Sequence, residues 1–372
     1  MADWVDGSFP FEVKTGKAGR GCFATRCIPA GQVVLRCAPV AAVLTDRQLR
    51  HRCSRCFELA PRQPTCQRCG VARFCTACEA TAVAWKEHRG ECRVLRLLWT
   101  DPCIRAQLRL GPPGQMTDGA TTVLRLAVRL LAIRSRHAAG KMPLPLLSDE
   151  DGGGGSWKPA PEEDVIHDGW ADVEELAPCG GDAVQRYCES LPRGRSEELE
   201  GGSNAVRLLI RAPLMEVHGL LCQMTCNSMT LPPEEQVRRA MRSRQGGTWA
   251  DFGVALYPSG AMLNHSCSPT CLWFVRGGVL IVETVKPVKR GEELTIPYLP
   301  MCGSTVDRRN RIKKVFGFHC LCCRCSTSDE RGRATTTRKR LREPPRAPDS
   351  GTYKVAGGMR KKPTYKPTAG VR

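Results

Sequence analysis

Short runs of alternating apolar and polar residues predict β-strands in two separate parts of the chain. In the N-terminal part, strands are expected at residues 11–13, 22–25 and 32–35. In the later part, which covers residues 251–299, strands are expected at residues 254–257, 272–275, 279–285 and 294–299. The adjacent glycines Gly277 and Gly278 separate two of these runs, so a tight hairpin is predicted there.

Helical spacing dominates the region between the two β-rich parts. Within residues 93–147, apolar residues from Val123 to Ile133 recur at helical intervals, Thr121 or Thr122 is the expected N-cap, and the helix is expected to end before Gly140. A second helical pattern runs from residue 203 to 229, with an interruption at Pro213. Residues 161–202 carry too few apolar side chains for a structural assignment, and the glycine-rich residues 148–160 predict a flexible surface loop.

A third helix is expected after the last β-rich segment. Ser304 is the predicted N-cap of a basic helix that reaches Phe316.

Length and composition limit the classes of protein to which the chain can belong. The 372 residues are enough for a sizeable core and two or three modules. No signal peptide is recognised near Met1, and no apolar stretch approaches the roughly 18 residues of a membrane span.

The 22 cysteines therefore indicate metal ligation in a reducing compartment rather than a disulfide scaffold, and we expect a monomer in the cytoplasm, the nucleus or both. The net charge of +19 is concentrated at the C-terminal end. Residues 331–372 hold thirteen Lys/Arg against two Asp/Glu, which is +11 of the total. Weak nucleic-acid contact, nuclear import and solubility are all open roles for this tail.

The strongest local signal lies between residues 53 and 92. Seven cysteines and one histidine fall within forty residues, enough ligands for two tetrahedral zinc ions. Such a short span buries little core, so metal binding must supply folding energy. The eight residues are Cys53, Cys56, Cys66, Cys69, Cys75, Cys78, His88 and Cys92.

A second concentration of polar chemistry is the run Asn264-His265-Ser266-Cys267, which follows the apolar residues 261–263. About thirty residues later comes Gly291-Glu292-Glu293-Leu294, in a segment that ends at Tyr298. Cys320, Cys322 and Cys325 follow. Together with Cys267 they offer four thiolates, a complete ligand set for a third zinc ion.

The order of these motifs resembles that of SET-domain protein methyltransferases, and Gly19-Arg20-Gly21 with its following residues resembles the first segment of that domain. Phe74-Cys75 and the Trp85, His88, Cys92 spacing resemble a MYND zinc finger. The resemblance implies an α+β protein: a SET-type β fold split by a MYND finger and a helical insertion, with a cysteine-rich post-SET zinc site. It also implies an interleaved finger, with Cys53, Cys56, Cys75 and Cys78 on one zinc and Cys66, Cys69, His88 and Cys92 on the other.

The same resemblance predicts the domain order. An N-terminal SET segment (1–45) is followed by the MYND finger (46–96) and a helical insertion (97–225) whose flexible loop is near 148–202. The SET core (226–300), the post-SET zinc cluster (301–328) and a disordered basic tail (329–372) complete the chain.

The resemblance implies a protein-lysine N-methyltransferase that uses S-adenosylmethionine, with Tyr298 as its catalytic residue in a lysine channel. The residues expected at the cofactor are Gly19, Arg20, Gly21, Asn227, Ala261, Asn264, His265, Phe316 and Phe318. Plainer interpretations remain open: the Gly-x-Gly run is also typical of a hairpin turn, and Tyr298 of a core tyrosine. The chain could also be an adaptor whose finger binds a proline-rich peptide beside a weak or inactive SET domain. Pro297, Phe316 and Met229, which depart from the family's common pattern, keep this alternative open.

Overall fold

The structure is a computed structural model. It describes residues 9–16, 19–60, 63–80, 82–107, 120–140, 165–176, 214–242 and 251–326. The described residues all belong to one compact unit, Met1–Ser328. The glycine-rich run near 152–155 and the basic tail lie outside the described residues.

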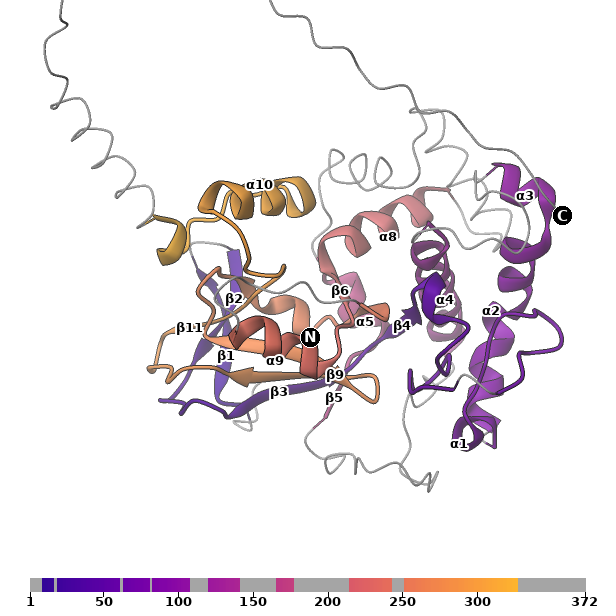
Figure 1. Ribbon diagram of the computed structural model, residues 1–372, viewed down its shortest axis with the longest axis horizontal. Helices are drawn as coiled ribbons and strands as arrows, with labels where there is room; N and C mark the ends of the chain where they lie inside the picture. Colours follow the sequence, from indigo (N-terminus) through magenta and orange to yellow (C-terminus); the bar gives the residue numbers. More distant parts are fainter. Residues whose placement is uncertain are drawn as a thin grey trace, which may run out of the picture. The chain divides into compact units, whose positions relative to one another are not determined.

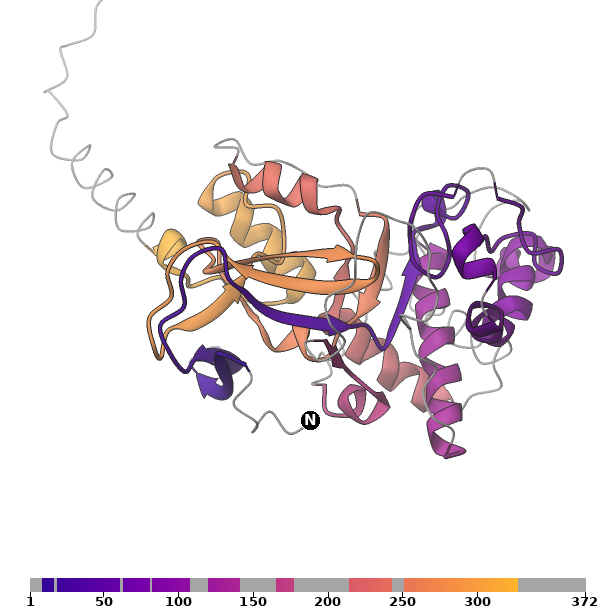
Figure 2. The same ribbon diagram turned by 90° about the horizontal axis from the view of Figure 1, so that it is seen from below.

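Eleven strands are described, and they form three small sheets (Figures 1 and 2). The sheet orders are β1-β2-β11-β8, β5-β3-β10-β9 and β4-β7-β6, so each sheet joins strands from the two β-rich parts of the sequence. Strand β3, for example, pairs antiparallel with β10. The strands are β1 (Phe11–Gly16), β2 (Gly19–Ala24), β3 (Val33–Ala38), β4 (Ala41–Leu44), β5 (Ile166–His167), β6 (Ser228–Thr230), β7 (Gly253–Leu256), β8 (Asn264–His265), β9 (Cys271–Arg276), β10 (Val279–Thr284) and β11 (Glu293–Ile296).

The helices lie mostly between these strands in the sequence, and α2 packs beside α4 (Figure 1). None of the helices in the described part of the chain is both long and apolar enough to cross a bilayer. The described helices are α1 (Thr76–Glu79), α2 (Ala82–Thr100), α3 (Pro102–Gln107), α4 (Ala120–Ala138), α5 (Trp170–Glu174), α8 (Leu214–Asn227), α9 (Glu234–Arg242) and α10 (Thr305–Phe316), with 3₁₀ turns η1 (Asp46–Gln48) and η3 (Gly260–Met262).

Local sequence signals located several of these elements. The predicted hairpin is confirmed: Arg276 pairs with Val279, and both Gly277 and Gly278 have positive φ, as the tight turn requires. The cap of α10 is also confirmed, because the Ser304 hydroxyl accepts from the Asp307 N–H while the Asp307 carboxylate accepts from the Ser304 N–H.

One local prediction was wrong, and one region without an assignment is partly ordered. Thr121 and Thr122 do not cap α4, which begins at Ala120; their hydroxyls donate to Asp46 Oδ1 at 2.5 Å and 3.0 Å instead. The buried Asp46 carboxylate also accepts from Arg125, so a tertiary ion pair takes the hydroxyls that a cap would use. Part of the region left unassigned is ordered, because Trp170 and Val173 bury the short helix α5 against α4.

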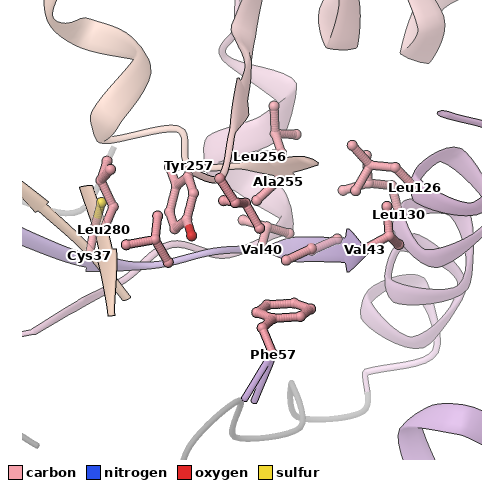
Figure 3. Close-up of a cluster of buried hydrophobic side chains, with 14 of the residues drawn as sticks. Cys37, Val40, Val43, Phe57, Leu126, Leu130, Ala255, Leu256, Tyr257 and Leu280 are labelled. Atoms are coloured by element: carbon pink, nitrogen blue, oxygen red, sulfur yellow. The ribbon is translucent and has the colours of Figure 1, made fainter. Parts of the chain in front are cut away.

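The main core joins the sheets to α4 and to the cysteine-rich segment. Figure 3 shows Val40 and Val43 between the α4 side chains Leu126 and Leu130 on one side and Phe57 on the other. Phe57 comes from the segment between the first two cysteine pairs and is 4% exposed. The cysteine-rich segment therefore shares a hydrophobic core with the β-sheets and is not an isolated finger.

Candidate active site

Three sequence-distant segments meet around strand β11. On one side β11 pairs antiparallel with β2, with Glu293 opposite Phe23. On the other side it pairs in parallel with β8, so that Thr295 is opposite Asn264 and Ile296 is opposite His265. We call this arrangement of β2, β11 and β8 the seam. It brings the Gly-x-Gly, Asn-His and Glu-Glu-Leu motifs of the sequence side by side.

The amide of Asn264 is fixed by two acceptors in the seam. Its Nδ2 donates to the Arg20 carbonyl oxygen at 2.9 Å and to Glu293 Oε1 at 2.8 Å. Both partners are acceptors only, so they determine which side of the amide carries the nitrogen. Both amide hydrogens are therefore used within the protein, and the side-chain oxygen of Asn264 is left as a hydrogen-bond acceptor.

Gly21 is required by this arrangement. A Cβ at position 21 would lie 2.5 Å from Glu293 Oε1 and 2.7 Å from Asn264 Nδ2, closer than real contacts allow. Gly19 is different, since its φ of +96° favours glycine while a Cβ there would meet nothing within 4 Å. The space at Gly21 is thus filled by the protein's own side chains, which a motif alone could not reveal.

Tyr298 lies two residues beyond β11, at the end of the seam. Its hydroxyl donates to the Leu263 carbonyl oxygen at 2.8 Å. Burial raises the pKa of the Tyr298 phenol well above its ordinary value, and the nearby Glu293 carboxylate acts in the same direction. The hydroxyl is therefore neutral near pH 7, with its oxygen lone pairs left as acceptors. Pro297, just before it, follows the end of β11, where a missing N–H is tolerated.

Aromatic side chains surround Tyr298. The ring centroid of Phe316, the last residue of α10, is 4.9 Å from that of Tyr298, and Phe318 makes an edge contact at 6.4 Å. The two phenylalanines also contact each other at 6.5 Å. Phe318 is 38% exposed, so this aromatic group reaches the surface.

A small hollow that is open to solvent adjoins the seam at Arg20, and half of its lining residues are charged. Its acidic side chains come from the 165–176 segment, which the sequence left unassigned; the apolar residues Trp170, Val173 and Leu176 are the signal that could have marked that segment as packed. Asp168 accepts from the Ser259 N–H and hydroxyl at 2.9 Å and 2.5 Å. The lining residues are Arg20, Asp168, Asp172, Glu175, Leu176, Pro258, Ser259 and Met262.

The other predicted cofactor residues have different surroundings. Ala261 lies in η3, next to the Met262 that lines the hollow. A Cβ on neighbouring Gly260 would lie 3.3 Å from Met229 Sδ, so this thioether packs against η3. Asn227 ends α8, and its Nδ2 donates to the Gln223 carbonyl oxygen at 2.7 Å, a bond within the helix. Its role at a cofactor stays a prediction.

The third cysteine cluster lies next to the seam. The sulfur atoms of its four members lie within 4.8 Å of one another. The Cys267 sulfur is 3.8 Å from that of Cys320 and 3.6 Å from that of Cys325, near the roughly 3.8 Å edge of a tetrahedron with 2.3 Å Zn–S bonds. The buried guanidinium of Arg308 donates to Cys325 Sγ at 3.7 Å, which favours thiolate charge. This cluster contains Cys267, Cys320, Cys322 and Cys325.

Two further clusters occupy the cysteine-rich segment, and in each the ligand atoms lie within 4.8 Å of one another. In the second cluster, Cys69 Sγ lies 3.6 Å from His88 Nε2 and accepts from the N–H groups of Val71 and Ala72 at 3.4 Å. These distances and donor types fit tetrahedral zinc. The first cluster contains Cys53, Cys56, Cys75 and Cys78, and the second contains Cys66, Cys69, His88 and Cys92, the same sets as in the expected interleaving.

A family model described as the SET domain matches residues 19–299, three quarters of the chain. The chain belongs to the SET-domain family. The match begins at β2 and ends just past Tyr298, so it spans all three segments of the seam. The architecture above is therefore a SET-domain fold with mixed helices and strands, and its cysteine clusters have the composition of metal sites.

Curated relatives of this SET-domain chain include the mouse (Mus musculus) histone-lysine N-methyltransferase SMYD3, 25% identical over 85% of this chain and 61% of the relative. The chicken (Gallus gallus) N-lysine methyltransferase SMYD2 is 26% identical over 88% of this chain and 62% of the relative. The chain thus spans about three fifths of the length of these relatives. A solved structure of Rubisco LSMT bound to AdoMet covers 85% of this chain and 53% of that chain with 13% identity and a TM-score of 0.36, too distant a likeness to carry an argument.

Proposed function

We propose that this SET-domain chain is a protein-lysine N-methyltransferase that uses S-adenosylmethionine. The observation that carries the proposal is the seam, where the free acceptor of Asn264 and the neutral hydroxyl of Tyr298 project from neighbouring segments. The names of the relatives, histone-lysine and N-lysine methyltransferase, support the same activity.

The chemistry of the seam and hollow fits the cofactor. Bound S-adenosylmethionine supplies a methyl group activated on a sulfonium. The guanidinium of Arg20 suits its carboxylate, and the Asn264 oxygen suits an N–H donor of the same molecule. The carboxylates of Asp172 and Glu175 in the hollow suit its positive charge. Gly19, Gly21, Asn227, Ala261, His265, Phe316 and Phe318 complete the proposed cofactor site.

We assign Tyr298 the task of orienting the substrate lysine. The Tyr298 hydroxyl donates its hydrogen to the Leu263 carbonyl oxygen, so the lone pairs of the hydroxyl oxygen can accept from the N–H groups of the amine. Only a neutral amine has the electron pair that attacks the methyl group. Phe316 and Phe318 pack around the Tyr298 ring, so an amine that enters this aromatic group is desolvated, and desolvation favours loss of the ammonium proton to solvent water before the amine reacts.

We further propose that the three clusters hold structural zinc ions. The first two form a MYND-type finger within residues 46–96, and the third is a post-SET site within 301–328. The N-terminal SET segment is then formed by residues 1–45, the helical insertion by residues 97–225 and the SET core by residues 226–300. Cytoplasmic or nuclear location, a monomeric state and weak nucleic-acid contact through 329–372 remain predictions.

Two measurements test the enzyme. Calorimetry should detect saturable S-adenosylmethionine binding to the intact chain, and Asn264→Ala should weaken it by about tenfold or more, because it removes one hydrogen bond and disrupts the seam. Transfer of a labelled methyl group to core histones should fall about 10²-fold in Tyr298→Phe, since the amine loses its orienting acceptor. Tyr257→Phe is the matched control, because the Tyr257 hydroxyl also donates to a backbone oxygen, Gly278 O at 2.7 Å, but lies in the core. A folded, zinc-loaded protein that binds no S-adenosylmethionine would refute the proposal.

One observation favours a second function for the finger. Leu59, between the first two cysteine pairs, is 66% exposed, so an apolar side chain is available to a partner such as a proline-rich peptide. The adaptor alternative predicts that a fluorescent proline-rich peptide binds the full chain and that Leu59→Ser weakens this binding. Peptide binding without methyl transfer would favour the adaptor over the enzyme.

A further inference from the structure

Both ring nitrogens of His265 are occupied within the protein. Nδ1 accepts the backbone N–H of Tyr298 at 3.1 Å. Nε2 lies 3.4 Å from Cys267 Sγ. A backbone N–H only donates, so Nδ1 must be the acceptor and a neutral ring carries its hydrogen on Nε2, directed at the sulfur.

The sulfur on the other side of this contact is a member of the third cluster. Cys267 Sγ lies 3.8 Å from Cys320 Sγ, and the Cys267 N–H donates to Cys322 Sγ at 3.4 Å. The cluster therefore holds Cys267 from two directions. A thiolate in this position is a good acceptor for an imidazole N–H.

The ring is also fixed by packing. His265 belongs to β8 and is paired with Ile296 of β11, two residues before Tyr298. Its ring centroid is 5.3 Å from that of Tyr298 and 6.2 Å from that of Phe318. The imidazole thus lies between the cysteine cluster and the aromatic group, in contact with both.

We propose that His265 is a positioning residue that links the third cysteine cluster to the backbone of Tyr298. This proposal rests on the methyltransferase function proposed above. The ring contributes no nitrogen to the cofactor; any contact of residue 265 with the cofactor is made by its backbone or by ring carbons. The cluster holds Nε2–H, which leaves Nδ1 as the acceptor that fixes the N–H of Tyr298. Ordering of the cluster is thereby transmitted to the phenol that orients the lysine.

Two substitutions each preserve one half of this link. His265→Asn places an amide oxygen near the position of Nδ1 and keeps the acceptor for Tyr298, but loses the contact with Cys267. His265→Gln places an amide nitrogen near the position of Nε2 and keeps the donor to Cys267, but leaves the Tyr298 N–H without its acceptor. If the ring instead bound the cofactor directly, the two variants would lose cofactor affinity; the proposed link predicts that they lose kcat.

The test measures S-adenosylmethionine affinity by calorimetry and kcat on core histones at saturating cofactor. We expect both variants to bind the cofactor with less than the roughly tenfold loss of one hydrogen bond. We expect kcat to fall about 10²-fold in His265→Gln, because Tyr298 is displaced, and to fall in His265→Asn as well. Affinity losses of tenfold or more with kcat retained would overturn the proposal, and so would two variants with unchanged kcat.

A spectroscopic measurement tests the proposed role of His265 without a variant and without an activity assay. Nitrogen-15 NMR of the zinc-loaded wild-type chain, with labelled histidine, reports which ring nitrogen carries hydrogen. We expect hydrogen on Nε2 and none on Nδ1 of His265; the opposite tautomer or a doubly protonated ring overturns the link. If the wild-type chain transfers no methyl group, the proposed function fails while this result still decides the role of His265.

Discussion

The guanidinium of Arg129 on α4 holds both carboxylate oxygens of Glu91 on α2, with Nη2–Oε1 at 2.6 Å and Nε–Oε2 at 2.7 Å. Burial alone would raise the pKa of Glu91, but the charge and hydrogen bonds of Arg129, together with smaller contributions from His88, lower it to about 2. The same carboxylate lies 3.6 Å from Nδ1 of His88, a member of the second cluster. Arg129 also donates to the Ala42 carbonyl oxygen of β4, so it connects this cluster to the β-sheets.

Replacing Arg129 by methionine should destabilise the protein strongly. The change leaves the Glu91 carboxylate, 4% exposed, without its countercharge, which costs about 3–5 kcal/mol of unfolding free energy. Urea unfolding monitored by circular dichroism measures the loss. Arg93→Met is the control, because Arg93 is exposed on the same helix and should change stability by less than about 0.5 kcal/mol. Equal effects of the two substitutions would show that the ion pair is not stabilising.

How much of this site the sequence could predict follows from where each interaction lies along the chain. Asn264 and Tyr298 stand inside short motifs, and the cysteine pairs have spacings that a tetrahedral metal requires, so local order was enough to nominate them. The partners that orient these side chains come from distant parts of the chain. Asn264 donates to the Arg20 carbonyl oxygen across 244 positions and Tyr298 donates to that of Leu263 across 35, and no periodicity encodes such pairings.

The same limit applies to the role of individual side chains. Gly21 was expected at the cofactor, whereas the space that its missing Cβ leaves is taken by Glu293 and Asn264. Thr121 was expected to cap a helix, whereas the buried Asp46 takes its hydroxyl. In both cases residue type correctly marked a special position. The reason became visible only when a tertiary partner was placed beside it.

The Asp168 carboxyl should make stability depend on pH. Burial raises its pKa to about 6, against the opposing hydrogen bonds from Ser259. The folded state therefore binds a proton more tightly than the unfolded state, whose pKa is the ordinary 3.8. Below pH 3.8 the carboxyl is protonated in both states. As the pH rises from there to about 6, unfolding free energy is lost, by roughly 3 kcal/mol in total.

Replacing Asp168 by asparagine should remove this loss, because the amide can accept from the Ser259 N–H and donate to its hydroxyl without ionising. We expect Asp168→Asn to gain stability relative to the wild type as the pH rises from 5 to 7.5. Chemical unfolding of both proteins at each pH gives the difference, in which contributions from the metal clusters cancel. A difference that stays constant or shrinks over this range would contradict the raised pKa.

Adding one methyl group at position 21 should disrupt the seam. In Gly21→Ala the new Cβ would collide with the Glu293 carboxylate and the Asn264 amide, at a cost of about 1–3 kcal/mol. Displacement of Asn264 should also weaken S-adenosylmethionine binding, which calorimetry would measure. Gly219→Ala is the control: it is exposed in α8 with open space around it, so alanine should be neutral or stabilise the helix by about 1 kcal/mol. An unchanged affinity of Gly21→Ala for S-adenosylmethionine would contradict the assignment of Asn264 to the cofactor site.

Two adjacent cysteines, one inside the third cluster and one outside it, should differ in their effect on metal content. Cys322 belongs to the third cluster, whereas Cys323 is exposed and outside it. Native mass spectrometry of the wild-type chain should find three zinc ions, one for each cluster. Cys322→Ser should lower this number to two, because a hydroxyl is a poor zinc ligand beside three thiolates, while Cys323→Ser should keep all three. Because the third cluster holds Cys267, loss of its metal should also reduce methyl transfer; full activity with two zinc ions would separate the cluster from the active site.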